Sequence, residues 1–181
     1  NGSLAPLVDV FQQLTGALAY LHGKGLLHLD LKPANVVFAD GRAKLIDFGL
    51  SRSLRLEEVN RARGTAHYAA PEVFAGGPVD ARADLYSLGA TLYRAFTGKH
   101  PITGRSVAEI AAHHRQTVPA PPAGVPEEIS RLILKLLAKS PRHRFQSAAE
   151  VAKALRGLAP GSDGAAGVLA GGEPDFVGRR A

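Results

Sequence analysis

The sequence predicts a mainly α-helical α+β domain with a small antiparallel β-hairpin. Three observations support this fold class. Apolar residues recur at helical spacing over residues 7–21 and 84–96 and in three later stretches. Two short apolar runs flank Asp40-Gly41, a dipeptide typical of tight hairpin turns. The 181 residues are 45% hydrophobic and 21% charged, which is the usual balance of a globular domain.

The N-terminal elements follow from residue spacing and turn residues. The first helix has an apolar stripe at spacings of four, three, four and three, made by Leu7, Phe11, Leu14, Leu18 and Leu21. Gly23 and Gly25 are expected to end this helix. Short strands are predicted over residues 26–28, 36–38 and 43–46, which are apolar and partly β-branched.

The C-terminal elements are predicted to be helices. Residues 84–96 carry apolar side chains on nearly every face, so this helix should be buried all round at the centre of the fold. Further helices are predicted over residues 106–115, 126–137 and 147–158. Ser106 and Ser147 are suited to cap the first and the last of these, and Pro126 to open the middle one.

The composition excludes several classes of protein. Cysteine is absent, which excludes disulfides, thiolate zinc sites and cysteine nucleophiles and favours a cytoplasmic location. The net charge of +6 comes from scattered basic residues, so no nucleic-acid partner is predicted. Charged residues interrupt every long apolar stretch, so no membrane-spanning segment is predicted. The chain begins at Asn1 and lacks methionine, which predicts a fragment of a longer protein.

The residues most suited to chemistry lie in two neighbouring loops. The amide oxygen of Asn35 and the carboxylate of Asp47, twelve residues later, are hard donors that suit Mg²⁺. Asp30 is placed to orient and deprotonate an incoming hydroxyl, and Lys32 to neutralise a phosphoryl group in transfer. This combination predicts phosphoryl transfer.

The sequence resembles the protein kinase family, whose motifs it carries in order. Residues 28–35 read HLDLKPAN and match the catalytic loop, Asp47-Phe48-Gly49 matches the metal loop, and Ala70-Pro71-Glu72 matches the end of the activation segment. The Lys32-Pro33 pair is the serine/threonine-type form of the catalytic loop. Over roughly residues 4–158 the resemblance implies the C-terminal lobe of a kinase that transfers the γ-phosphoryl group of Mg-ATP to a serine or threonine hydroxyl of a protein.

The resemblance also implies roles for individual residues, including those that would bind ATP and Mg²⁺. The implied set is Asp30 as catalytic base, Lys32 as phosphate-side cation, Asn35 and Asp47 as metal ligands, Val37 as adenine floor, and Thr65 as a bridge between Asp30 and Lys32. Asp84 would anchor the backbone of the catalytic loop, and Arg144 would pair with Glu72. His28 is expected to be a packed residue that supports the loop, and His113 and His114 are expected on the surface.

The sequence departs from the family pattern in two respects. It contains no glycine-rich G-x-G-x-x-G loop and no strand that carries the phosphate-pairing lysine, so these residues alone are expected to be inactive. Leu29 stands where many relatives have an arginine that grips an activation-segment phosphate, and leucine cannot pair a phosphate. This difference either reflects drift at a packed position or predicts regulation without phosphorylation of Ser51 and Ser53.

Three segments are expected along the chain. Residues 1–158 would form the kinase lobe, and residues 159–172 form a linker of mostly Gly, Ala and Pro. Residues 173–181 include Phe176-Val177-Gly178-Arg179, which is similar to the opening of ATPase modules that follow some bacterial kinase domains. The expected intramolecular partners are therefore an upstream N-terminal lobe and a downstream domain.

Two other functions fit parts of the pattern. A kinase-like lobe without its other half could be a non-catalytic docking or regulatory module. A small-molecule phosphotransferase can share the H-x-D-x-x-x-x-N loop and a later metal aspartate. Ala70-Pro71-Glu72 and residues 84–89 argue against the phosphotransferase, because such enzymes have no peptide-binding segment to end.

Overall fold

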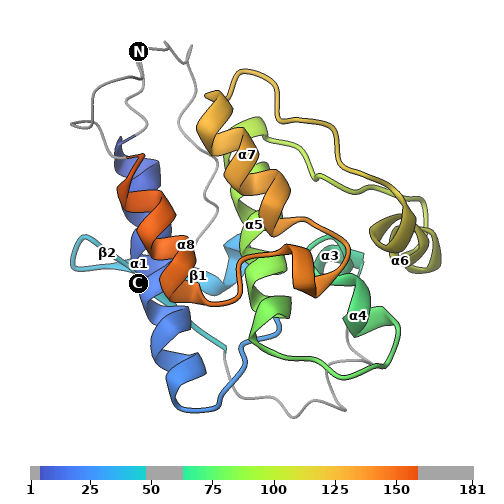
Figure 1. Ribbon diagram of the computed structural model, residues 1–181, viewed down its shortest axis with the longest axis horizontal. Coiled ribbons are helices and arrows are strands. Elements are labelled where there is room, and N and C mark those ends of the chain that lie inside the picture. Colours follow the sequence, from blue (N-terminus) through green and yellow to red (C-terminus); the bar gives the residue numbers. More distant parts are fainter. Residues whose placement is uncertain (1–4, 48–62, 159–181) are drawn as a thin grey trace.

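The computed structural model describes residues 5–47 and 63–158, which fold into a helical domain with one β-hairpin (Figure 1). The elements in chain order are α1 (Ala5–Gly23), η1 (Pro33–Asn35), β1 (Val36–Ala39), β2 (Arg42–Leu45), α3 (Arg63–Ala66), α4 (Pro71–Phe74), α5 (Ala81–Thr97), α6 (Val107–Gln116), α7 (Glu127–Leu136), η2 (Pro141–His143) and α8 (Ala148–Arg156). The predicted α+β fold with a small antiparallel hairpin is confirmed.

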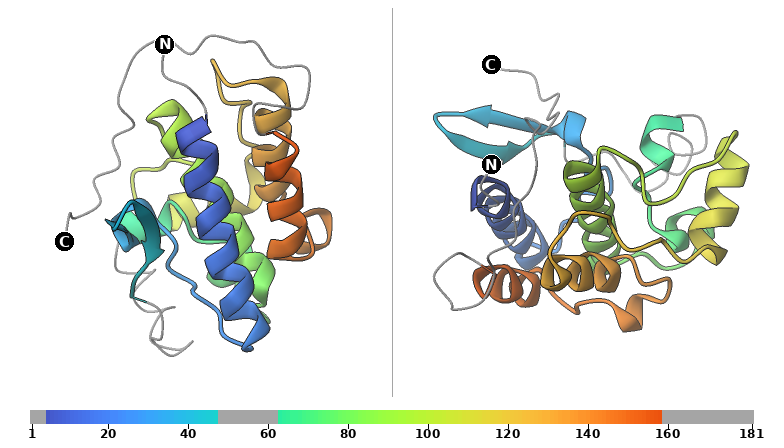
Figure 2. Two further views of the ribbon diagram at one scale, coloured as in Figure 1. Left: turned by 90° about the vertical axis from the view of Figure 1, so that its left-hand side faces the viewer. Right: turned by 90° about the horizontal axis from the view of Figure 1, so that it is seen from above.

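Helix α5 forms the centre of the domain, as its apolar pattern predicts. Residues 83–92 of this helix are all buried. Helix α7 packs on one side of α5 and α1 on another, while α1 also packs against α8 and β2 (Figure 2). Gly89 allows the close approach of α7, because a Cβ atom there would lie 2.6 Å from the Cβ of Leu136. The main core therefore surrounds α5, and the first turn of this helix contacts the loop of residues 28–35.

Polar side chains define the helix starts and hold the hairpin in place. Ser106 accepts a hydrogen bond from the amide of Glu109, and Ser147 caps α8 in the same way. Both caps agree with the sequence prediction. The Gln13 side chain of α1 accepts a hydrogen bond of 2.8 Å from the amide of Ala43, which ties the hairpin to the first helix.

Two sequence predictions are wrong. Residues 26–28 do not form a strand, because the amide of His28 donates to the carboxylate of Asp84 instead of to a neighbouring strand. His114 is fully buried and not on the surface, where the sequence placed it. Its ring fills the space between α6 and α5, and the hydroxyl of Tyr86 lies 2.7 Å from its Nδ1 atom.

Helix α6 lies apart from the main bundle. It packs against α3 and α4 and lies beyond them at one side of the domain (Figure 1). A second, smaller hydrophobic cluster of Ala66, Ile102 and Ile110, with Phe74 and Val107 packed against it, joins α6 to these short helices. No helix in the described ranges is both long and apolar enough to cross a bilayer.

Candidate active site

The catalytic loop brings Asp30, Lys32 and Asn35 together. The Lys32 amine donates hydrogen bonds to both carboxylate oxygens of Asp30, at 3.0 and 2.9 Å. The Asn35 amide nitrogen donates to the backbone carbonyl and to Oδ2 of Asp30, each at 2.8 Å. The side chains of Asp30 and Lys32 are 19% and 22% exposed, so the carboxylate is held in place while one edge stays open to a ligand.

The orientation of Asn35 follows from its two partners. Both partner atoms on Asp30 are hydrogen-bond acceptors, so the NH₂ group of Asn35 must face them. Its Oδ1 atom is therefore the side-chain atom left to bind a ligand. Asn35 is buried and ends the short helix η1, which Pro33 begins, so its position is fixed by local structure as well as by Asp30.

Thr65 joins this group from a distant part of the sequence. Its hydroxyl accepts a hydrogen bond of 2.8 Å from the Lys32 amine. Lys32 thus lies between the carboxylate of Asp30 and the hydroxyl of Thr65, which belongs to α3. The sequence placed Thr65 as the bridge, whereas the contacts in the structure place Lys32 in the middle.

The hairpin brings Asp47 to the same end of the site as Asn35. Strands β1 and β2 pair Val36 with Leu45, and the amide of Ile46 donates to the carbonyl of Asn35 at 3.0 Å. Asp47 follows directly, is exposed, and has a φ of 60°. One strand pair therefore sets the spacing between the two expected metal ligands.

Asp84 anchors the backbone of the catalytic loop, as the family resemblance implies. Its carboxylate is fully buried and accepts hydrogen bonds from the amides of His28 at 2.9 Å and Leu29 at 2.7 Å. Leu29 has a φ of 60°, which is a costly conformation for a residue with a side chain. The two hydrogen bonds to a buried charge offset this strain and fix the loop just before Asp30.

Two histidines support the loop. His28 is fully buried, and its Nε2 lies 3.1 Å from the carbonyl of Ile46 while its Nδ1 accepts from the amide of Asp30. This pattern requires a neutral ring that donates from Nε2, and it links the catalytic loop to the strand end before Asp47. His22 lies 2.8 Å from Asp84, a contact that sequence spacing alone gives no means of finding.

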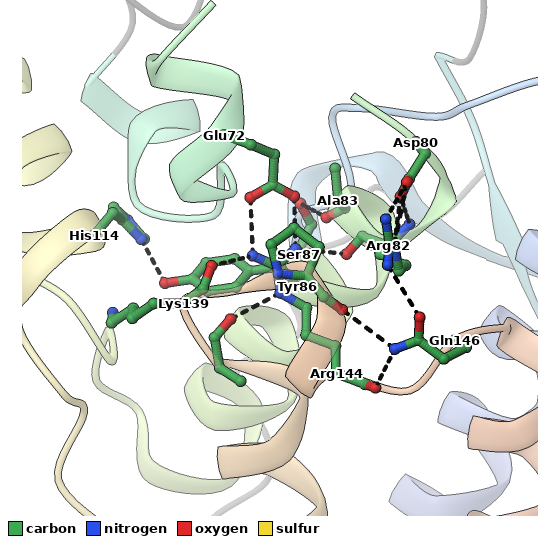
Figure 3. A network of polar contacts seen from close by, with 12 residues as sticks. Glu72, Asp80, Arg82, Ala83, Tyr86, Ser87, His114, Lys139, Arg144 and Gln146 are labelled. Atoms are coloured by element: carbon green, nitrogen blue, oxygen red, sulfur yellow. Dashed lines mark hydrogen bonds and ion pairs between the residues drawn. The ribbon is translucent and has the colours of Figure 1, made fainter. Parts of the chain in front are cut away.

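The predicted pair of Glu72 and Arg144 forms as expected. The guanidinium donates to the two carboxylate oxygens at 2.6 and 2.8 Å, and its side chain is fully buried (Figure 3). Arg144 also donates to the backbone carbonyls of Ala138, Arg82 and Lys139. This network connects the end of the 70–72 motif to the start of α5 and to the segment after α7.

One further predicted site residue lies on the hairpin, and others fall outside the described residues. Val37 lies on β1 opposite Lys44 and is half-buried. Phe48, Gly49, Ser51 and Ser53 fall outside the described residues, as do residues 159–181.

The arrangement provides a held carboxylate, a cation beside it, and two oxygen donors at one strand end. In the described part of the chain, no cluster of three His, Cys, Asp or Glu side chains is arranged to hold a metal. One amide and one carboxylate match the donor set of Mg²⁺, which completes its shell with phosphate oxygens and water.

Comparisons with known proteins show what the chain is similar to. The model of the protein kinase domain matches residues 3–155. Over 163 residues the chain is 38% identical to the serine/threonine-protein kinase PknB of Mycobacterium tuberculosis, covering 83% of this chain and 26% of that protein. It is 38% identical over 170 residues to a probable serine/threonine-protein kinase of Streptomyces coelicolor, covering 86% of this chain and 25% of the other. The chain thus spans about a quarter of the length of the curated relatives it matches.

Proposed function

The chain belongs to the protein kinase family, of the bacterial serine/threonine type, and we propose that it is the C-terminal lobe of a kinase that phosphorylates protein hydroxyls with Mg-ATP. The observation that carries this proposal is the joint placement of Asp30, Lys32 and Asn35 beside the strand end that precedes Asp47.

Asp30 acts as the catalytic base in this proposal. Its carboxylate is fixed by Lys32 and by the amide of Asn35, so it can accept a hydrogen bond from an incoming serine or threonine hydroxyl without reorganisation. Lys32 contacts Asp30 and Thr65 at once, so its charge lies where the transferred phosphoryl group would pass.

Asn35 and Asp47 would hold Mg²⁺ together with the phosphates of ATP. Because the NH₂ group of Asn35 faces Asp30, its oxygen is free to bind a cation. Mg-ATP supplies the phosphoryl group and the metal charge that offsets the negative charge of the phosphates. Val37 would cover one face of the adenine from β1.

The described lobe would provide only part of an ATP site. The sequence contains no glycine-rich phosphate loop and no strand lysine. We therefore propose that residues 1–158 act together with an N-terminal lobe and that residues 159–172 link this lobe to a further domain that begins near residue 173. These 181 residues alone should show no phosphoryl transfer.

Two substitutions in the full-length protein test the assignment. Asp30→Asn should leave binding of Mg-ATP nearly unchanged and abolish turnover, because it removes only the proton acceptor. Asp47→Asn should weaken binding of Mg-ATP, because it removes a charged metal ligand. Nucleotide binding is measured by calorimetry and turnover by transfer of labelled phosphate to protein.

Asp40→Asn is the matched control. Asp40 lies at the hairpin turn with a side chain that is 90% exposed, so this change should alter neither binding nor turnover. Turnover that persists in Asp30→Asn would show that Asp30 is not the base, and we would then assign the lobe to a docking or regulatory role.

A further inference from the structure

Helix α6 is connected to the 63–70 segment by three histidines. His67, in this segment, stacks on His100 with ring centroids 4.1 Å apart and planes 15° apart. His67 also donates from Nδ1 to the carbonyl of Ile102 at 3.0 Å. Nδ1 of His114, on α6, lies 2.7 Å from the hydroxyl of Tyr86 on α5. These contacts link α6 and its preceding loop to two separate parts of the lobe.

The surroundings of His100 and His114 favour the neutral form of both rings. The hydroxyl of Tyr86 lies 2.7 Å from Nδ1 of His114, and burial raises the pKa of this hydroxyl, so it keeps its proton and cannot act as a counter-charge for a protonated ring. Nε2 of His114 is buried and has no hydrogen-bond partner among the described residues, so a protonated ring would carry an N–H there without an acceptor. Nδ1 of His100 is buried and has no hydrogen-bond partner among the described residues, so a proton added there would be left without an acceptor.

Basic groups act on the pKa values of these two rings. Burial, together with the nearby His67 and Arg94, lowers the pKa of His100 to about 4. Tyr68 also contacts His100, edge to face, and burial raises the pKa of its hydroxyl, so it stays neutral.

His114 lies in a similar field. Burial lowers its pKa to about 3, and Lys139, His67 and His100 act in the same direction, while the nearby backbone of Ala66 opposes them. The carboxylate of Glu72, on α4, is already paired with Arg144. The site therefore resists protonation as long as α6 stays packed.

The apolar contacts that hold α6 are few. The second hydrophobic cluster has three fully packed members, Ala66, Ile102 and Ile110, and is separate from the main core around α5. An element held by a small core can open locally at a lower free-energy cost than the rest of the domain.

We propose that the contact between α6 and the 63–70 segment is acid-sensitive: when protons bind to His100 and His114, α6 separates from this segment and thereby frees the segment whose Thr65 contacts Lys32. This proposal rests on the proposed function in one respect: if the lobe is a kinase, the freed segment is where a protein substrate would lie. In the open form both rings meet water and regain the ordinary pKa of histidine, so acid favours opening.

Hydrogen–deuterium exchange of the full-length protein tests the proposal. From His114 alone, the open population should rise about 30-fold between pH 7.5 and pH 5, and protonation of His100 adds to this. After correction for the intrinsic pH dependence of exchange, the protection of amides in α6 and in residues 63–70 should fall by at least that factor. Amides of α5 should keep their protection.

Matched variants identify the groups responsible. A double variant, Tyr86→Phe with His114→Phe, removes the titrating ring without leaving a buried hydroxyl unpaired, and it should lose the roughly 30-fold part of the pH effect that His114 contributes. His100→Gln, at a half-buried position that tolerates change more easily, should lose part of it. His143→Gln replaces an exposed histidine and should keep all of it.

Protection of α6 that is independent of pH in the unmodified protein would overturn the proposal. The proposal would also be overturned if acid reduced amide protection equally in His100→Gln and His143→Gln and if the double variant kept the full pH effect. Exchange requires no phosphoryl transfer, so either result leaves the proposed kinase function untouched, and loss of that function leaves the exchange result valid.

Discussion

Replacing Arg144 with alanine should destabilise the lobe rather than alter its chemistry directly. The substitution removes two hydrogen bonds to Glu72 and three to backbone carbonyls, all made by a side chain with no solvent exposure. It also removes the guanidinium that lies 4.8 Å from the ring centroid of Tyr86. The Glu72 carboxylate, only 14% exposed, would keep its charge without a partner.

The expected loss is about 3 to 5 kcal/mol, which is typical when one member of a buried ion pair is removed. A domain of this size has a total stability of roughly 5 to 15 kcal/mol, so the loss is a large fraction of it. At about 2 to 4 °C per kcal/mol, the melting temperature should fall by roughly 6 to 20 °C. Differential scanning calorimetry measures this directly.

Arg142→Ala is the control, because Arg142 lies in the same short helix η2 but is exposed. Its effect should stay within about 0.5 kcal/mol. The double variant Glu72→Ala with Arg144→Ala should cost less than the sum of the two single changes, because the pair acts as a unit. If Arg144→Ala melts at the same temperature as Arg142→Ala, the network does not stabilise the fold and the reasoning is wrong.

Three further predictions concern other parts of the core. Lys139→Met should stabilise the protein at pH 7 by about 1 kcal/mol, after allowance for the partial exposure of this side chain. Burial and Arg144 lower the pKa of Lys139 to about 8, and its amine has no hydrogen-bond partner among the described residues. That advantage should shrink in denaturant titrations as the pH rises from 8 toward 10.5, because the lysine loses its proton in the folded state first. Gly89→Val should lower the melting temperature sharply, because the added carbons collide with Leu136. Gly16→Val is the control, at an exposed position of α1 where an added Cβ meets no neighbouring atom, and an equal or larger loss there would contradict this packing. Asp84→Asn should reduce both stability and turnover, because an amide has one acceptor oxygen for the three groups that the carboxylate binds, and unchanged kinetics would show that the anchor is dispensable.

Apolar periodicity located the long helices well because each of them packs one or more faces against a shared core. Helix α1 is the clearest case, since Phe11, Leu14 and Leu18 are all fully buried. The hairpin was also predictable, because Asp40 and Gly41 both adopt the positive φ values that such turns require. The short elements α3, α4 and η2 were not predicted, because helices of three or four residues have no period to detect.

The errors arose where tertiary contacts override local pattern. Residues 26–28 look like a strand, but the buried carboxylate of Asp84, more than fifty positions away in sequence, takes the amide of His28. His114 looks like a surface residue, but the hydroxyl of Tyr86 gives its ring a partner inside the fold. In both cases the deciding group lies on α5, and local spacing carries no information about it.

The way Asn35 binds Asp30 limits how this site could be re-engineered. An acidic residue would attract a divalent cation more strongly than an amide does, so Asn35→Asp looks like a simple improvement. Its second oxygen would then lie where the NH₂ group now sits, 2.8 Å from an oxygen of Asp30, and two negative charges would repel at that distance. One acid would retain a proton at neutral pH, and the gain in cation affinity would be lost together with the proton acceptor that we propose Asp30 to be.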